Sequence, residues 1–562
     1  MSGLDSPFNK PKPVVSLDVR VLDALAAGIL PYPVPPGRKY EYGTAGFRMK
    51  ADAGLEHVVF TVGLIAALRS KLLKSATIGI MITASHNPPE DNGVKLVDPM
   101  GDMLQQSWEG YATTLANTQN ADLAKTYEQF VNDILVSVIS QNQDRPANVV
   151  IGRDTRPSGP GLVKALKAAL DAVGATYQDY GYLTTPQLHY MVRCINTQKH
   201  PVPFGIPTEE GYYQKMANAF KTMMYGRKIN GPVIVDCANG VGAPKLKELI
   251  KYLPTSEEGG IDIKVVNDDI LKPEVLNHDC GADYVKTRQR APPGSKAAIN
   301  DRCCSLDGDA DRLVYYYTDS SGFHLLDGDR IAILGAVFLK EMAEKAGLAD
   351  KLKVGLVQTA YANGASTEYV KKVLDVPIEV TATGVKHLHH AAARFDIGVY
   401  FEANGHGTIL FSEKATQIIR ETQPRNPGQK YALDSLSASI DLINQTVGDA
   451  ISDMLFTEVV LAYKSWTPEN WLGIYKDLPN RLVRVTVKDR SVFRTTDAER
   501  KLESPKGIQN EINKAVASYV KGRAFARPSG TEDVLRVYAE AHYPHEAEAL
   551  AAQVEEIVKK YG

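Results

Sequence analysis

Three aspartates at alternate positions, Asp307, Asp309 and Asp311, have the types and spacing to bind a cation. Small residues between them let the carboxylates converge, and carboxylate oxygens are preferred ligands of Mg²⁺ and Ca²⁺. An EF-hand loop counted from Asp307 needs glycine sixth and glutamate twelfth, but Arg312 and Thr318 stand there. Without a cation, clustered carboxylates repel one another. The spacing favours a divalent-metal site (the metal loop, residues 307–311) over a solvated turn.

A serine loop, residues 83–89 (TASHNPP), directly follows the apolar run from Ile78 to Ile82. The hydroxyl of Ser85 is a weak nucleophile that needs a base or a metal, and His86 stands beside it. Serine and asparagine are also common turn residues, so a helix-capping serine is the alternative. The loop predicts a reactive hydroxyl at the end of a strand.

A phosphate loop, residues 527–531 (RPSGT), is followed by a further arginine. Arginine forks match phosphate oxygens in pairs. The sequence GxxxxGK[ST] is absent, so this is not a Walker loop. The alternative is a structural loop with surface arginines. The predicted phosphate-binding residues are Arg527, Pro528, Ser529, Gly530, Thr531 and Arg536.

A fourth loop follows the strand-like run from Ile397 to Tyr400 and contains Glu402, Asn404 and His406. Their side chains can hydrogen-bond sugar hydroxyls or an amide, although alone the loop is equally typical of a plain turn. We call residues 402–406 the sugar loop. A reactive hydroxyl, a metal trap, a polar loop and an oxyanion site in one chain indicate metal-assisted phosphoryl transfer to a phosphorylated small molecule.

The elements that must position these loops follow one recurring pattern. Three times, a β-branched run leads through a Gly- or Asn-bearing loop into an amphipathic helix, starting near residues 148, 232 and 354. Such alternation predicts α/β domains with helix-covered sheets, whose ligands bind at the carboxyl ends of strands. The last ~110 residues predict an α+β domain from the spacing of their elements. Breaks are expected near residues 192, 322 and 445, and Thr416–Leu433 looks loop-rich.

Composition excludes several function classes. The formal net charge of the 562 residues is -2, which argues against bulk binding to nucleic acid or an anionic membrane. The N-terminus lacks the pattern of a signal peptide, and the longest apolar stretches, such as Ile331–Leu339, fall short of a membrane span. Five cysteines without a CxxC pair suit a reducing compartment. We expect a cytoplasmic protein with a small-molecule partner; the oligomeric state stays open.

The motifs TASHNP, DGDADR and RPSGT, together with GTAGFR at residues 43–48, resemble those of the α-D-phosphohexomutases. The resemblance runs in the family's order from about Tyr42 to Glu540. It implies four domains round a central cleft, each contributing one loop: three similar mixed-sheet α/β domains and a C-terminal α+β domain. The expected domains are 1–192 with the serine loop, 193–322 with the metal loop, 323–445 with the sugar loop and 446–562 with the phosphate loop.

The extended runs around the motifs, such as FEANGHGT, are similar to the amino-sugar branch of this family. That similarity implies interconversion of N-acetylglucosamine 6-phosphate and 1-phosphate, a step towards UDP-N-acetylglucosamine. It also implies one Mg²⁺ per subunit and a sugar 1,6-bisphosphate as intermediate or activator. Where hexose mutases usually carry a Glu-x-Ser-Gly-His sequence, this chain has Ala403-Asn404-Gly405. We infer that a small alanine and an asparagine accommodate a 2-acetamido group.

The resemblance also implies residue roles. Ser85 carries a phosphoryl group and, with Asp307, Asp309 and Asp311, holds Mg²⁺. Position in matching motifs makes Arg48, His86 and Lys95 the acid–base candidates, of which arginine normally stays charged and so suits charge stabilisation. The substrate-binding candidates outside the phosphate loop are Glu402, Ala403, Asn404, His406 and Lys386.

The sequence is also compatible with three alternative functions. A phosphoglucomutase or phosphomannomutase keeps the chemistry and changes the sugar. A catalytically silent sugar-phosphate sensor binds without turnover, which the intact serine and aspartates disfavour. A phosphatase releases inorganic phosphate steadily.

Overall fold

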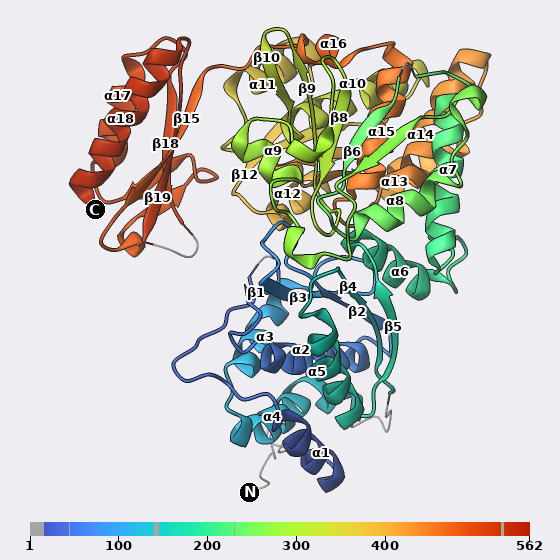
Figure 1. Ribbon diagram of the computed structural model, residues 1–562, viewed down its shortest axis with the longest axis vertical. Coiled ribbons are helices and arrows are strands. Elements are labelled where there is room, and N and C mark those ends of the chain that lie inside the picture. Colours follow the sequence, from blue (N-terminus) through green and yellow to red (C-terminus); the bar gives the residue numbers. More distant parts are fainter. Residues whose placement is uncertain (1–15, 44, 140–144, 230, 530–532) are drawn as a thin grey trace, which may run out of the picture.

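The computed structural model describes residues 16–43, 45–139, 145–229, 231–529 and 533–562. Figure 1 shows the N-terminal unit at the bottom, two units above it and the C-terminal unit to one side. In the described ranges, no helix combines the length and the apolar character that crossing a membrane requires.

The first unit is built on a mixed sheet with strand order β1-β3-β2-β4-β5. Its central strand β2 contains the apolar run before the serine loop, and all six of its residues are buried. The helices α1 to α5 lie on one side of the sheet and α6 lies on the other (Figure 1). The elements are β1 Phe47–Lys50, β2 Thr77–Ile82, β3 Asp91–Val97, β4 Asn148–Arg153, β5 Thr176–Tyr182, α1 Val19–Ile29, α2 Leu55–Leu72, α3 Glu109–Ala116, α4 Asn120–Ile139, α5 Gly159–Ala172 and α6 Thr185–Thr197.

The second unit has a mixed sheet in the order β10-β9-β8-β6-β7. The strands β7, β6 and β8 run parallel, and β9 and β10 add two antiparallel strands. The metal loop joins β8 to β9, so it lies at the carboxyl end of a central strand, where α/β sheets bind ligands. The elements are β6 Val233–Asp236, β7 Ile263–Val266, β8 Arg302–Leu306, β9 Leu313–Asp319, β10 Gly322–Leu326, α7 Glu209–Met224, α8 Gly242–Ile250 and α9 Ala282–Arg288.

The third unit has the sheet order β12-β11-β13-β14, with β14 antiparallel. The sugar loop is the turn between β13 and β14. The elements are β11 Val354–Thr359, β12 Ile378–Thr381, β13 Ile397–Phe401, β14 Gly407–Phe411, α10 Gly328–Lys345, α11 Gly364–Tyr369 with a π-helical continuation Val370–Leu374, α12 Val385–Ala392, α13 Glu413–Glu421, α14 Pro427–Leu442, α15 Ala450–Lys464 and α16 Pro468–Leu472.

The prediction of a loop-rich stretch over Thr416–Leu433 is wrong, because α13 and α14 occupy most of it. The side chain of Ser412 accepts a hydrogen bond from the backbone of Ala415 and so caps α13. Asn426 caps α14 in the same way. These caps satisfy backbone donors that a helix start leaves free, and they allow helices in a polar stretch.

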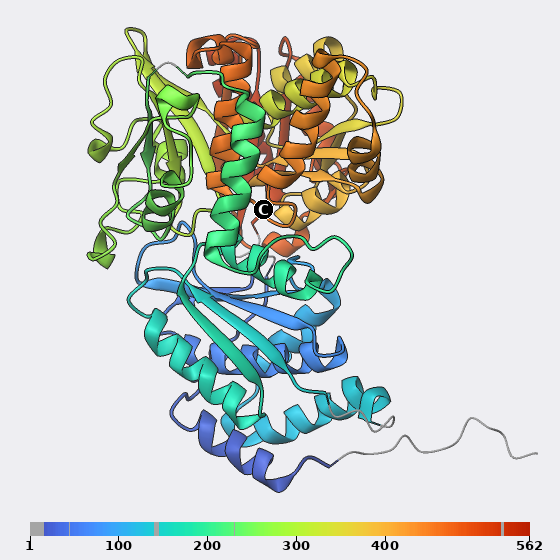
Figure 2. The same ribbon diagram turned by 90° about the vertical axis from the view of Figure 1, so that its right-hand side faces the viewer.

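The second and third units share one hydrophobic core. A single cluster of buried side chains runs from Tyr190 to Trp471. Its centre is a helical layer of α7, α14 and α15 between the two sheets (Figure 2). The predicted break near residue 445 falls between α14 and α15, inside this core, and we infer that the last boundary follows α16. The breaks near 192 and 322 fall within α6 and at the first residue of β10.

The C-terminal unit has its own core, from Val485 to Val558. It is an antiparallel sheet in the order β15-β19-β18, with a separate β16-β17 hairpin. The α/β and α+β character predicted for the four units is confirmed. The elements are β15 Asn480–Thr486, β16 Arg494–Thr496, β17 Lys501–Ser504, β18 Arg523–Pro528, β19 Val534–Glu540, α17 Ile508–Ala517 and α18 Pro544–Tyr561.

Candidate active site

Ser85 leaves the end of β2 in a left-handed backbone conformation. Its φ is 53°, which is uncommon for a residue with a side chain and typical of functional loops. The backbone N–H of Ser85 donates to Thr83 Oγ1 at 3.0 Å, and Thr83 Oγ1 donates to Asp154 Oδ2 at 2.7 Å. The serine is thus held from below by a buried chain of hydrogen bonds.

Arg156 holds the rest of the serine loop, and sequence reasoning missed it. Its fully buried guanidinium donates from Nε to Asp154 at 3.0 Å. Its other two nitrogens donate to backbone carbonyl oxygens. Because the fork is planar, it fixes several loop peptides at once. The carbonyl acceptors are those of Ser85, Asn87, Pro88 and Asp91, at 2.5 to 2.9 Å.

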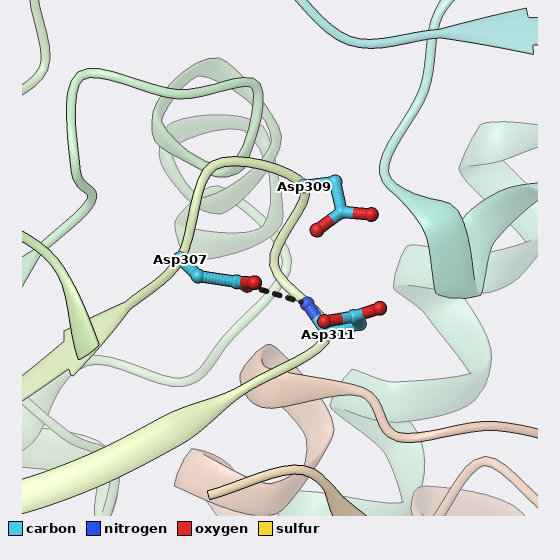
Figure 3. Close-up of side chains that lie close together, drawn as sticks. All are labelled: Asp307, Asp309 and Asp311. Carbon is cyan, nitrogen blue, oxygen red and sulfur yellow. Dashed lines mark hydrogen bonds between the residues drawn. The ribbon is translucent and has the colours of Figure 1, made fainter. Parts of the chain in front are cut away.

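The metal loop brings its three carboxylates together as predicted. One oxygen from each of Asp307, Asp309 and Asp311 lies within 4.8 Å of the others, and all three residues are buried. Figure 3 shows them around a single turn, with Asp307 accepting a hydrogen bond from the backbone of Asp311 at 3.0 Å. Gly308 allows the turn to touch the serine loop, because a Cβ there would lie 2.6 Å from the carbonyl oxygen of Ser85.

The serine and metal loops meet although they belong to different sheets. Ser85 Oγ donates a hydrogen bond to Asp307 Oδ2 at 2.6 Å. Asn277, another residue that the sequence did not reveal, donates from the second unit to the carbonyl oxygen of Ser85 at 2.9 Å. A hydroxyl and three carboxylates from two units therefore form one buried site.

The charges at this site fit a divalent cation. Burial, together with Asp311 and Asp309, raises the pKa of Asp307 well above its usual range. Burial also acts to raise the pKa of Asp311, but His406 and Lys95 outweigh it and lower that pKa. Among the described residues, Asp309 Oδ1 is buried without a hydrogen-bond partner, and Asp311 Oδ1 has only His406 Nδ1 at 3.4 Å and Arg312 Nε at 3.9 Å beside it. A cation would satisfy both oxygens and remove the repulsion.

Other groups surround the carboxylates. Lys95 Nζ lies 3.4 Å from Asp309 Oδ2 and 3.5 Å from Asp311 Oδ2. Thr185 Oγ1, at the start of α6, donates to Asp309 Oδ2 at 2.5 Å. Thr184 caps α6 with its side chain. The partner of Thr185 is fixed only by the packing of the first unit on the second.

The remaining acid–base candidates lie beside the serine. His86 Nδ1 is 3.5 Å from Ser85 Oγ. Burial and the neighbouring guanidiniums of Arg312 and Arg48 lower the pKa of His86 to about 2, so its imidazole is neutral at neutral pH. Arg48 Nη1 donates to Asn87 Oδ1 at 3.3 Å, and burial with Arg312 nearby lowers the pKa of Arg48.

The sugar loop is held against the metal loop by its second half. His406 Nδ1 lies 3.4 Å from Asp311 Oδ1, so this histidine contacts the metal loop. Gly405 has a φ of 88°, and a Cβ there would lie 2.0 Å from the carbonyl oxygen of Leu313. Glu402, Ala403 and Asn404 are only half-buried, which leaves them accessible to a ligand.

Lys386 has protein partners at the contact between the first and third units. Its Nζ donates to the carbonyl oxygen of Leu104 at 3.2 Å and to the carboxylate of Glu109. In this arrangement its charge is balanced by the first unit.

The phosphate loop lies at the end of β18 on the C-terminal unit. Arg527 Nε donates to Tyr361 OH at 3.0 Å, and Arg527 Nη1 donates to Glu499 Oε1 at 3.2 Å. Arg536 stands opposite Arg527 in the strand register and is exposed. The backbone of Ser529 donates to Val534 at 2.8 Å. Pro528 is half-buried at the strand end, and the predicted ligands Gly530 and Thr531 lie outside the described residues.

Family models match most of the chain. Residues 44–200 match the α/β/α domain I of phosphoglucomutase/phosphomannomutase, in two overlapping segments, and 482–557 match its C-terminal domain. Residues 203–314 and 327–466 match domains II and III of phosphoacetylglucosamine mutase AMG1. The chain is 50% identical to phosphoacetylglucosamine mutase of Candida albicans, over 94% of this chain and 98% of that protein. It is 50% identical to that of Homo sapiens, over 92% and 94%.

Solved structures are similar over nearly the whole chain. N-acetylphosphoglucosamine mutase of Aspergillus fumigatus in complex with GlcNAc-6P and magnesium is 58% identical, with a TM-score of 0.92 over 97% of this chain and 99% of that one. A serine-to-alanine variant of the same mutase in complex with glucose 1,6-bisphosphate has a TM-score of 0.91 at 58% identity, over 97% of this chain and 100% of that one.

Proposed function

The chain belongs to the phosphoacetylglucosamine mutases, and from this membership we propose that Ser85 carries the phosphoryl group moved between the 6- and 1-positions of N-acetylglucosamine. The reaction is an intramolecular phosphoryl transfer of the isomerase class. The observation that carries the proposal is the 2.6 Å hydrogen bond from Ser85 Oγ to Asp307 Oδ2. This contact supports the proposal, because it brings Ser85 Oγ to the edge of the carboxylate cluster.

Asp307, Asp309 and Asp311, with an oxygen of the phosphorylated Ser85, would hold one Mg²⁺ per subunit. Asp309 Oδ1, which is buried and has no hydrogen-bond partner among the described residues, supports this ligand set. The bound cation would neutralise charge that develops on the transferring phosphoryl group.

The transfer balances without a further reactant. The 1-hydroxyl oxygen of N-acetylglucosamine 6-phosphate attacks the phosphorus on Ser85, the bond from phosphorus to Ser85 Oγ breaks, and the 1,6-bisphosphate forms. The bisphosphate reorients in the site. Ser85 Oγ then attacks the 6-phosphate, and N-acetylglucosamine 1-phosphate leaves while the serine is phosphorylated again.

The proton of the attacking hydroxyl must be taken up and later returned. We assign this exchange to His86, because its Nδ1 lies 3.5 Å from Ser85 Oγ. A phosphoryl dianion on Ser85 would favour the protonated form of His86. Arg48 and Lys95 would stabilise charge, since an arginine stays protonated and Lys95 lies between Asp309 and Asp311.

The other end of the substrate would bind on the C-terminal unit. Arg527 and Arg536 would hold the non-transferring phosphate, together with Pro528, Ser529, Gly530 and Thr531. Glu402 and Asn404 would bind ring hydroxyls and the acetamido group, beside the small Ala403. His406 and Lys386 would act from the edge of this site, because each already has a protein partner.

We place the reaction in the cytoplasm, as a step towards UDP-N-acetylglucosamine. All five cysteines are described and are free and buried, which suits a reducing compartment. The partner is a small-molecule sugar phosphate.

The test compares kcat/KM for N-acetylglucosamine 6-phosphate and glucose 6-phosphate, with phosphosite mapping of the purified protein. We expect preference for the amino sugar, phosphate on Ser85, and no turnover by Ser85→Ala. A higher kcat/KM for glucose 6-phosphate would show that the substrate preference is that of a hexose mutase. Full activity of Ser85→Ala would refute the phosphoserine mechanism, and steady release of inorganic phosphate would indicate a phosphatase.

A further inference from the structure

Glu499, in the turn between β16 and β17, joins two parts of the site that no sequence motif connects. Its Oε1 accepts a hydrogen bond from Arg527 Nη1 at 3.2 Å. Its Oε2 accepts one from the backbone N–H of Thr383 at 2.9 Å. Thr383 lies in the third unit, just before α12, so one carboxylate links the phosphate-loop arginine to a neighbouring unit.

The turn that carries this carboxylate has an unfavourable backbone conformation. Asp497, Ala498 and Glu499 are three consecutive residues with side chains, and their φ values are 54°, 54° and 65°. Left-handed conformations are costly for such residues and persist where surrounding contacts hold them. Asp497 supplies such contacts through ion pairs with Arg500 at 2.5 Å and Lys501 at 3.1 Å.

Arg527 is fixed from two sides. Tyr361 OH, on the loop after β11, accepts from Nε at 3.0 Å, while Glu499 binds Nη1. The side chains of Arg527 and Glu499 are only 16% and 19% exposed. No hydrogen bond joins Arg527 Nη2 to any of the described residues. Two of the three guanidinium nitrogens are therefore occupied by the protein, and within the described part of the chain nothing hydrogen-bonds the third.

We propose that Glu499 is a positioning residue that orients the Arg527 guanidinium for the non-transferring phosphate of the substrate, and that its bond to Thr383 makes this orientation depend on contact between the third and C-terminal units. The inference rests on the proposed function. A guanidinium fork binds phosphate well only in a narrow range of orientations. Loss of the carboxylate frees the fork to rotate about its long side chain.

The first experiment measures KM and kcat for N-acetylglucosamine 6-phosphate in Glu499→Gln. An amide can accept one of the two hydrogen bonds but presents N–H groups to the other donor. We expect KM to rise about tenfold, with kcat changed by less than about threefold. Glu499→Asp keeps the charge and shortens the side chain, so its KM should lie between those of Glu499→Gln and the unmodified protein.

The matched control is Glu503→Gln, which removes an exposed carboxylate from β17 of the same hairpin. Its KM should stay within about twofold of that of the unmodified protein. Melting temperatures are measured for all variants, and Glu499→Asp keeps the test decisive if Glu499→Gln is poorly folded. A fall in KM on removing the carboxylate would overturn the proposal, because it would mean that Glu499 competes with phosphate.

A double-mutant cycle separates positioning from a general structural effect. If Glu499 acts through Arg527, Glu499→Gln should raise KM by less than about twofold in an Arg527→Lys background. An undiminished rise there would overturn the proposal and leave the proposed function intact. If the unmodified protein does not turn over the amino-sugar phosphate, the proposed function fails instead. In that case the dissociation constant of glucose 6-phosphate is measured for Glu499→Gln, Arg527→Lys and the double variant. Additive effects of the two substitutions on this constant would again overturn the inference.

Discussion

The two ends of the proposed active site are built in opposite ways. At the transferring end, Ser85 is 1% exposed, Asp307 is fully buried, and hydrogen bonds from both the first and second units hold them. At the docking end, Arg536 is exposed on a strand of the C-terminal unit. Arg527 there is held by one tyrosine and one glutamate.

This difference matches what each end must do. Phosphoryl transfer is accelerated mainly by fixed charges aimed at the reacting group, so the transferring end gains from burial and rigidity. The docking end must accept a phosphate at carbon 6 and, after reorientation, a phosphate at carbon 1. A site with few protein partners and one exposed arginine, Arg536, can meet both. Substitutions at the buried end should therefore change kcat, and those at the exposed end should change KM.

The largest expected effect belongs to the buried end. Asp309→Asn removes one charge from the cation site but keeps an oxygen that can accept from Thr185. We expect kcat at saturating Mg²⁺ to fall roughly a thousandfold, since a metal supplies several kcal/mol of charge stabilisation. Added Mg²⁺ should raise the melting temperature of the unmodified protein and have little effect on the variant.

The control is Asp262→Asn, an exposed aspartate of the same unit. Its kcat and its Mg²⁺-dependent melting shift should match those of the unmodified protein. An Asp309→Asn variant that retained more than about a tenth of kcat would show that the aspartates do not hold the catalytic metal.

An intermediate effect is expected at the exposed end. Arg536→Ala should raise KM for N-acetylglucosamine 6-phosphate about tenfold and leave kcat at saturation nearly unchanged, because it removes a docking contact that both ground state and transition state use. Its melting temperature should not fall, since the side chain is exposed. Lys514→Ala, on α17, is the matched control for loss of one surface cation. A variant whose kcat fell while KM stayed constant would break the proposed division between the two ends.

The sequence predicted the reacting residues of the transferring end better than the residues that hold them in place. The spacing of Asp307, Asp309 and Asp311 is local, so the metal loop followed from the chemistry of neighbouring residues. Contacts of Arg156 and Asn277 with Ser85 join residues 71 and 192 positions apart. Arg156 and Asn277 reach Ser85 only because β4 and the second unit pack against the serine loop. The periodicity of apolar residues does not predict these contacts.

The fold shows the same limit. The central strands β2 and β11 were predicted from their apolar runs, because a strand inside a sheet that is covered on both sides buries both of its faces. The polar stretch after Ser412 was misjudged, since its helices depend on caps and on a shared core with α7. No sequence motif pointed to Glu499, because its proposed positioning role depends on a strained turn and on two partners far along the chain, Thr383 and Arg527.

The smallest expected effect concerns acid sensitivity, which should be concentrated at the buried end. His189, on α6, is buried and donates from Nδ1 to the carbonyl oxygen of Gly101 at 2.6 Å. Burial, with Lys95 nearby, lowers the pKa of His189 from 6.5 to about 3. As pH falls below about 6.5 the unfolded chain binds a proton that the folded chain does not, so stability falls with pH. The contribution of this histidine to the loss of stability should reach about 0.8 kcal/mol between pH 7.5 and pH 6.

His189→Gln should make the urea midpoint less dependent on pH over that range, while His545→Gln, an exposed control on α18, should not. Equal pH dependence in all three proteins would mean that His189 is protonated without cost in the folded state, and acid sensitivity would then not distinguish the two ends.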